Sequence, residues 1–332
     1  MAVDDTKLLF IVGRGRSGTS LLQTILNTHP QISVAPEAQF IMFLRRRYQN
    51  ANWNESRIAA FARDLWLEER LENWHLQPEK LEEQLLSHGR NASFANLCKE
   101  VYYQYGLSKQ KQDLKIVGDK NPHYALYLKH LIDLYPNAKF VHIVRDPRDT
   151  VLSYKAVNFD ADHTATLANR WNIYNKAIVK FSKKMPGKFY FLRFEDLLTK
   201  PEKTLTQLCE FLGVEYEPEM LNFYKKEQDW EADFRKNLKN PLDPNKAYRW
   251  KKEMSHSNIQ YASAITSKMA SKFGYEVPEL KYAGLRRLLT VPHCLYAHWV
   301  TFLEKLIYKF PLAITAPAIA FYRKLTAPKK SD

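Results

Sequence analysis

The feature that most constrains the fold is a short apolar segment that ends in glycine and leads into a helical pattern. Residues 8–12 read Leu-Leu-Phe-Ile-Val, a continuous apolar run typical of a buried parallel strand. Apolar residues recur at helical spacing over residues 21–26, and a His-Pro pair at 29–30 ends this pattern. A helix start that follows a strand through a glycine loop offers unpaired N–H groups to an anion. The sequence therefore predicts an anion-binding loop at residues 13–20.

Strand-like and helical segments alternate along the following chain. Residues 53–112 contain apolar positions at three- and four-residue spacing and few strand-like runs, which predicts a helical insertion. Further strands are predicted over residues 114–117, 139–144 and 188–193, and helices over about 124–135 and 202–212. We therefore expect an α/β, P-loop-like three-layer fold with a central, mostly parallel sheet, a helical insertion and a helical C-terminal tail.

The glycine loop has the spacing of a Walker A motif but lacks its lysine. Gly13 and Gly18 stand at the motif's glycine positions, and Thr19 occupies the position of the lysine. Arg16 can replace that lysine as a bidentate clamp on a phosphate or sulfuryl oxygen. Further donors come from the hydroxyl groups of Ser17, Thr19 and Ser20. These features disfavour a nucleoside triphosphatase, and such a site requires no metal ligand.

A second motif, Val-Arg-Asp-Pro-Arg-Asp at residues 144–149, follows a predicted strand and opens a helix. Pro147 suits the first helical turn, and Ser153 lies roughly two turns beyond Arg145. Arg145 stands at the carboxyl end of its strand, where open α/β sheets bind ligands. A purely structural Arg-Asp pair would explain the same motif, so this segment alone leaves both interpretations open.

Together, the two motifs resemble the sulfotransferase superfamily that uses 3′-phosphoadenosine 5′-phosphosulfate, with the closest match to the tyrosylprotein and glycan branch. The resemblance covers roughly residues 7–215. It implies transfer of a sulfuryl group from this nucleotide to a hydroxyl of a glycan, a lipid or a tyrosine, without a metal. In the family's pattern Arg145 and Ser153 would hold the 3′-phosphate. The 5′-phosphosulfate would lie on Arg16, Ser17, Gly18, Thr19 and Ser20, with Arg14 and Gly15 in the same loop.

The resemblance also implies a set of catalytic residues. Lys120 matches the family's lysine before a short proline-containing turn, which stabilises charge during transfer, and Glu37 matches the base of the tyrosylprotein branch. Sulfuryl transfer needs an in-line oxygen nucleophile and neutralisation of charge on the bridging oxygen. Glu37, Lys120 and Arg16 suit these tasks. His123 is the competing base, and His29 is a weaker candidate.

Two positions depart from the family's pattern. Phe194 stands where tyrosylprotein sulfotransferases have a tyrosine, so it could stack on adenine but lacks the hydroxyl. Residues 247–251 resemble the family's segment that ends in a basic residue and tryptophan, yet Tyr248 replaces the serine that contacts nucleotide there. Arg249 is thus a further candidate nucleotide contact, and protein tyrosine as the acceptor is in doubt.

Charge and cysteine content bear on partners and compartment. The chain has 50 Lys and Arg against 36 Asp and Glu, a net charge of +14 that attracts polyanions. The three cysteines lie far apart and favour a reducing compartment. No basic segment precedes the first strand, so we expect no signal peptide. The expectation is a cytoplasmic protein, peripheral on a membrane if its tail binds one, with no nucleic-acid partner.

The tail, residues 281–332, contains nine Lys and Arg and two acidic residues, an excess of seven that is half of the chain's total. Large apolar residues recur in it at helical spacing, from Trp299 through Phe302 and Leu306 to Phe310. Such a helix can lie on an anionic membrane, or it can pack on the catalytic domain or on the partner subunit of a homodimer. We therefore divide the chain into a sulfotransferase domain, residues 1–280, and a basic amphipathic tail.

Two other function classes remain open. One is a P-loop-type kinase acting on a small molecule, although the Walker lysine and an obvious magnesium carboxylate are missing. The other is a non-catalytic glycan- or membrane-binding protein of the same fold. Residues 229–256 are rich in charge, Asn and Pro and predict a long surface loop, which with the helical insertion would shape an acceptor cleft.

Overall fold

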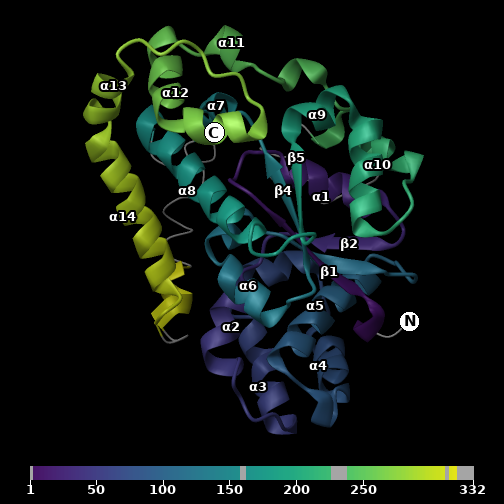
Figure 1. Cartoon of the computed structure of the whole chain (residues 1–332). Helices are drawn as coiled ribbons and strands as arrows, with labels where there is room; N and C mark the ends of the chain where they lie inside the picture. Colours follow the sequence, from purple (N-terminus) through teal and green to yellow (C-terminus); the bar gives the residue numbers. More distant parts are fainter. Residues whose placement is uncertain (1–2, 158–161, 226–237, 311–313, 320–332) are drawn as a thin grey trace, which may run out of the picture.

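A computed structural model of the protein describes residues 3–157, 162–225, 238–310 and 314–319 (Figure 1). Its centre is a five-stranded sheet with the order β2-β3-β1-β4-β5, and every neighbouring pair is parallel. The strands are β1 (Lys7–Val12), β2 (Ile32–Ala35), β3 (Ile116–Lys120), β4 (Lys139–Val144) and β5 (Phe189–Arg193). Because all strands run in one direction, their carboxyl ends meet at a single edge of the sheet.

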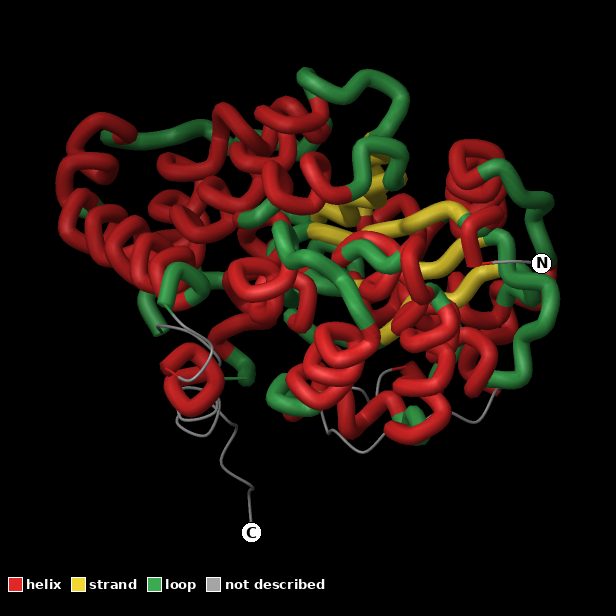
Figure 2. The backbone as a smooth tube through the Cα atoms, turned by 90° about the horizontal axis from the view of Figure 1, so that it is seen from below, coloured by secondary structure: helices red, strands yellow, loops and turns green. Residues whose placement is uncertain are grey.

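The central strand β1 is buried on both faces, which explains its continuous apolar sequence. Leu8, Phe10 and Val12 belong to one hydrophobic cluster, whereas Leu9 and Ile11 belong to the cluster on the opposite face. These two clusters fill the interfaces between the sheet and the two helical layers. The strands lie in the middle of the molecule, and helices surround them (Figure 2).

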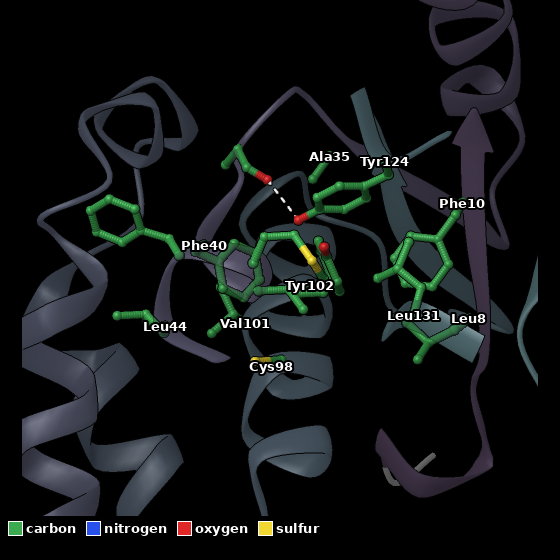
Figure 3. Close-up of a cluster of buried hydrophobic side chains, with 14 of the residues drawn as sticks. Leu8, Phe10, Ala35, Phe40, Leu44, Cys98, Val101, Tyr102, Tyr124 and Leu131 are labelled. Carbon is green, nitrogen blue, oxygen red and sulfur yellow. Dashed lines mark hydrogen bonds between the residues drawn. The ribbon is translucent and has the colours of Figure 1, made fainter. Parts of the chain in front are cut away.

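One helical layer consists mostly of the segment between β2 and β3. It contains α2 (Phe40–Tyr48), α3 (Glu55–Leu65), α4 (Pro78–Ser87) and α5 (Phe94–Ser108), and α6 (Leu128–Leu134) and α8 (Thr164–Ser182) complete it. Aromatic rings fill its contact with the sheet: Phe10 lies 6.3 Å from Tyr102 and 6.1 Å from Tyr124 between ring centroids (Figure 3). The helical insertion predicted from the sequence therefore covers one face of the sheet.

The opposite layer is built from α1 (Thr19–Thr28), α9 (Phe194–Thr199) and α10 (Pro201–Leu212). The remaining helices are α7 (Pro147–Lys155), α11 (Trp250–Glu253), α12 (His256–Ala270), α13 (Ala283–Leu289) and α14 (Val291–Ile307). Short 3-10 segments are η1 (Val3–Asp5), η2 (Glu69–Trp74), η3 (Gly89–Asn91), η4 (Pro122–Leu126), η5 (Pro218–Lys225), η7 (Pro244–Lys246) and η8 (Ser271–Phe273). Within the described residues, no helix is both long and apolar enough to cross a membrane.

The predicted fold class is confirmed, with differences in individual elements. The sequence did not predict β2, and the expected helix over residues 124–135 is divided into η4 and α6. The predicted surface loop is interrupted by η7 and α11 over residues 238–256, and its residues 229–237 lie outside the described part of the chain. The domain boundary at residue 280 stays a prediction.

Candidate active site

The loop between β1 and α1 is shaped by glycines in close contact with neighbouring elements. Gly18 is the N-cap of α1 and has a φ of 93°, and a Cβ added there would lie 2.3 Å from the Phe194 ring. A Cβ on Gly15 would lie 2.4 Å from the Tyr154 hydroxyl. Because glycine has no side chain to cap the helix, the first-turn N–H groups of α1 are available to an anion.

Side chains around this loop fit an anionic group. Ser17 is buried, and its Oγ has no hydrogen-bond partner among the described residues. Arg16 has left-handed backbone geometry with a φ of 64°, and its Nε donates a hydrogen bond to Ser153 Oγ at 3.2 Å. Such a conformation costs a non-glycine residue about 1–3 kcal/mol and is concentrated at ligand sites. The orphaned Ser17 hydroxyl and the positive charge of Arg16 therefore suit a phosphate or sulfate.

Arg14 is also buried, but its guanidinium lies against aromatic rings. It is 4.2 Å from the ring centroid of Tyr154 on α7 and 4.9 Å from that of Tyr174 on α8. These contacts join the loop to the helices that follow β4. In this structure the Arg14 guanidinium therefore contacts aromatic rings on α7 and α8.

Arg145 brings the second motif to the same loop. Its guanidinium lies 4.6 Å from the centroid of Phe194, and its nitrogens donate to the carbonyl oxygens of Arg16 and Lys246 at 3.5 and 3.3 Å. Burial lowers the pKa of Arg145, and the Asp149 carboxylate 3.8 Å away opposes that shift. The two motifs, about 130 residues apart in the sequence, thus meet at the carboxyl edge of the sheet.

The rest of the second motif has a structural role. Asp146 caps α7 by accepting a hydrogen bond from the Arg148 N–H, and the Arg148 guanidinium bonds both Asp146 oxygens at 2.8 and 2.6 Å. The Arg148 guanidinium also lies 3.6 Å from the centroid of the Trp250 ring. The backbone N–H of Trp250 donates to Asp149 Oδ1 at 2.7 Å. The structural interpretation therefore holds for Arg148, which fixes the segment around Trp250. Arg145 faces the loop, and its binding of a ligand stays a prediction.

Glu37 and Lys120 lie together because β2 and β3 are neighbours. Ala35 pairs with Asp119 at the ends of these strands, so the residues that follow emerge at the same edge. Buried Lys120 donates from Nζ to Glu37 Oε1 at 2.8 Å. The other Glu37 oxygen accepts from Arg70 at 3.1 Å. Sequence reasoning missed Arg70, which comes from η2 and has no local pattern that marks it.

The two histidines considered as bases have different surroundings. His123 follows Lys120 by three residues in the sequence. Its Nδ1 lies 3.1 Å from the Tyr174 hydroxyl, and burial lowers its pKa to about 4. Its ring is therefore neutral at neutral pH. His29 follows the far end of α1, where one ring nitrogen lies 2.9 Å from the Glu215 carbonyl oxygen and the other accepts from the Gln31 N–H. This places His29 away from the loop and gives it a structural role.

Phe194 and Arg249, the other two residues expected to contact the nucleotide, differ in their positions relative to the loop. Phe194 is buried against Gly18 and Arg145, so its ring lies beside the loop. Arg249 is exposed and forms two hydrogen bonds with Glu253, at 2.7 and 2.6 Å. In this structure the Arg249 guanidinium is therefore held by Glu253 through Nε and Nη2.

Comparisons with known proteins cover the region that contains this site. Residues 9–218, more than half of the chain, match the model of the sulfotransferase family. A protein-tyrosine sulfotransferase of Drosophila melanogaster is 25% identical over 65% of this chain and 40% of that protein. The omega-hydroxy-beta-dihydromenaquinone-9 sulfotransferase of Mycobacterium bovis is 26% identical over 62% of each chain. This chain thus spans less than two thirds of the length of either relative.

The fold has a counterpart among solved structures. The sulfotransferase domain of the Synechococcus PCC 7002 olefin synthase superposes with a TM-score of 0.61 and 24% identity, over 82% of this chain and 97% of that domain. The fold and the family predicted from the two motifs are therefore confirmed together. This chain belongs to the sulfotransferase family.

Proposed function

We propose that this chain transfers a sulfuryl group from 3′-phosphoadenosine 5′-phosphosulfate to a hydroxyl acceptor. The observation that supports this most is the meeting of three groups at one sheet edge: the loop of Arg16 and Ser17, the Arg145 motif, and the Glu37–Lys120 pair. The first two would bind the donor, with the 5′-phosphosulfate at the start of α1 and the 3′-phosphate between Arg145 and Ser153.

The third group would carry the chemistry. Glu37 takes the proton of the acceptor hydroxyl, the acceptor oxygen forms a bond to sulfur, and the bond from sulfur to the bridging phosphate oxygen breaks. Lys120 stabilises the negative charge that develops on that oxygen, which leaves with the nucleotide product. An ammonium has three donors, so Lys120 can contact the donor while it still bonds Glu37. The Arg16 guanidinium neutralises the sulfuryl oxygens.

The acceptor is proposed only as a hydroxyl. The Drosophila relative is named for a protein tyrosine and the mycobacterial relative for a hydroxylated menaquinone, so these relatives differ in acceptor. The helical insertion supplies Arg70 next to Glu37, so this cation would lie beside the acceptor hydroxyl.

Donor binding separates this proposal from the kinase alternative. We expect 3′,5′-adenosine bisphosphate to raise the melting temperature and magnesium-ATP to leave it unchanged, because a ligand stabilises only the fold that binds it. Arg16→Ala should weaken the bisphosphate effect, whereas Lys129→Ala, an exposed lysine on α6, serves as the control. Stabilisation by magnesium-ATP alone would instead indicate a kinase.

Transfer of labelled sulfate from the donor onto acceptors in a cell extract tests the reaction itself. Lys120→Ala should still bind the bisphosphate but lose transfer by roughly 100-fold or more, since a preorganised charge near the leaving oxygen is removed. Bisphosphate binding without transfer to any acceptor would show a non-catalytic member of the family. Equal transfer by wild type and Lys120→Ala would refute the assigned site.

A further inference from the structure

The second of the two C-terminal helices, α14, packs on the protein mainly through small and polar residues, and Ile307 at its end adds an apolar contact with the core. α14 lies along α8 (Figure 1), and its buried side is formed by Ala297 and Thr301. Glu304 is ion-paired with Arg170 on α8, and its carbonyl oxygen accepts a hydrogen bond from Tyr127 at 2.7 Å. Apart from Ile307, the side of α14 that faces the protein is therefore narrow and formed by small and polar residues.

The outer side of α13 and α14 has the opposite character. Large apolar side chains recur there and just after α14 and are 41–67% exposed; they include Leu288, Leu295, Trp299, Phe302, Leu303 and, three residues beyond α14, Phe310. We call these six residues the outer stripe. Among the described residues before Tyr282, four large hydrophobic side chains are exposed, by 37–46%, and they are scattered. A helix that buries alanine and threonine and exposes tryptophan and phenylalanine is typical of an interaction surface.

The charge around the outer stripe identifies its partner. Residues 281–310 contain five Lys and Arg and one acidic residue, Glu304, which is turned inward to Arg170. Arg286 and Arg287 lie near one end of the stripe, and Lys305 and Lys309 near the other. Basic ends around an aromatic and aliphatic centre are the pattern of helices that lie in the surface of an anionic bilayer.

A second copy of the chain suits this surface less well. In a symmetric dimer the same patch faces itself, so the basic residues of one helix would approach those of the other. Lys176 and Lys180 of α8 lie close enough to Cys294 and Lys305 to add to this charge. Like charges across an interface oppose association, whereas anionic headgroups are attracted by them.

We propose that α13 and α14 bind the surface of a bilayer rich in anionic lipid. The outer stripe enters the headgroup region, the flanking Lys and Arg residues contact the lipid phosphates, and the Ala297–Thr301 side keeps its packing on α8. This attachment is independent of the proposed transfer reaction, because none of its residues belongs to the candidate active site.

Vesicle co-sedimentation of the full chain tests the proposal. We expect binding to vesicles of phosphatidylcholine with phosphatidylglycerol, much weaker binding to phosphatidylcholine alone, and loss of binding as salt rises from roughly 0.1 to 1 M, where screening is nearly complete. Trp299→Glu with Phe302→Glu should reduce binding at least roughly tenfold, since two large apolar side chains lose their burial. The matched control is Leu67→Glu with Leu107→Glu, two exposed leucines in other regions.

Each variant is compared with wild type for melting temperature and for stabilisation by 3′,5′-adenosine bisphosphate, so that misfolding is not read as lost membrane binding. Equal sedimentation of wild type and the Trp299/Phe302 variant would overturn the proposal, as would equal binding to charged and uncharged vesicles. Light scattering supplies the other decisive result: a wild-type dimer that the same two substitutions dissociate, without vesicle binding, would assign the stripe to a second copy.

Discussion

At the scale of single residues, Glu37 is a carboxylate between two cations, Lys120 and Arg70. Glu37→Gln keeps the shape and an oxygen that can accept from these cations but removes the base, so we expect kcat to fall by about 10²–10⁴-fold. His123→Asn should retain kcat within roughly tenfold, because the His123 ring bonds the Tyr174 hydroxyl. Labelled transfer at saturating donor measures both variants. An inactive His123→Asn beside an active Glu37→Gln would make His123 the base.

The sequence could predict these residues only in part. Glu37 and Lys120 were predicted from the resemblance to the sulfotransferase superfamily, and their contact follows from the ends of two adjacent parallel strands. Arg70 was not predicted because its position depends on how η2 packs, and only the folded chain brings it within 3.1 Å of Glu37. Likewise, nothing in the loop sequence indicates that the Arg14 guanidinium lies between Tyr154 and Tyr174.

At the scale of elements, the turn from β1 into α1 depends on close contact at Gly18. Gly18→Ala places a methyl group against the Phe194 ring and adds left-handed strain, so we expect lower stability and weaker binding of 3′,5′-adenosine bisphosphate. Gly89→Ala is the matched control, because Gly89 also has a positive φ, of 50°, but has open space around it. Its cost should be about 1 kcal/mol with binding unchanged. Urea unfolding and calorimetry measure both quantities, and equal effects of the two substitutions would contradict the contact argument.

The segment around Trp250 depends on a buried ion pair. Arg148→Ala leaves Asp146 buried without its cation and removes the contact with Trp250, so unfolding free energy should fall by about 3–5 kcal/mol. Arg249→Ala removes an exposed pair with Glu253 and should cost less than about 1 kcal/mol. Denaturant unfolding of both variants checks this ranking. Similar losses would mean that Arg148 contributes no more than a surface pair.

Most elements could be predicted from periodicity, and the exceptions have physical causes. β2 has only four residues, includes Ser33 and closely follows a His-Pro pair. Its apolar run is therefore too short to be recognised as a strand in the sequence. The helix expected over residues 124–135 is interrupted at Tyr127, whose ψ of 15° is not helical and whose hydroxyl bonds Glu304 on α14. This contact joins residues that are far apart in the chain. It can therefore override the local helix propensity, and the local sequence does not reveal it.

At the scale of the whole molecule, the stability of the fold depends on the protonation of Glu195. Burial raises the pKa of this carboxyl to about 7 from an ordinary value of 4.5, and its oxygens accept from the Asp146 N–H and the Tyr275 hydroxyl. The folded chain therefore holds a proton that the unfolded chain releases. This contribution is fully present below about pH 4.5 and is lost as pH rises through 7, at a cost of up to about 3 kcal/mol.

Glu195→Gln removes this dependence, because glutamine does not titrate. Between pH 4.5 and 7.5, the unfolding free energy of the variant relative to wild type should rise by up to about 3 kcal/mol. Urea unfolding at several pH values measures the difference, and Glu79→Gln on the exposed side of α4 is the control. Parallel curves for wild type and Glu195→Gln would show that Glu195 is already ionised in the folded protein.

The strand order also determines when the chain can fold during synthesis. β1 leaves the ribosome first, yet its two neighbours, β3 and β4, begin more than 100 residues later. At roughly 5–20 residues per second, the most apolar strand waits about 5–20 s for its partners. During that interval α1 and the helical insertion emerge around an unpaired strand, and a chaperone that shields residues 8–12 would act at the step most exposed to aggregation.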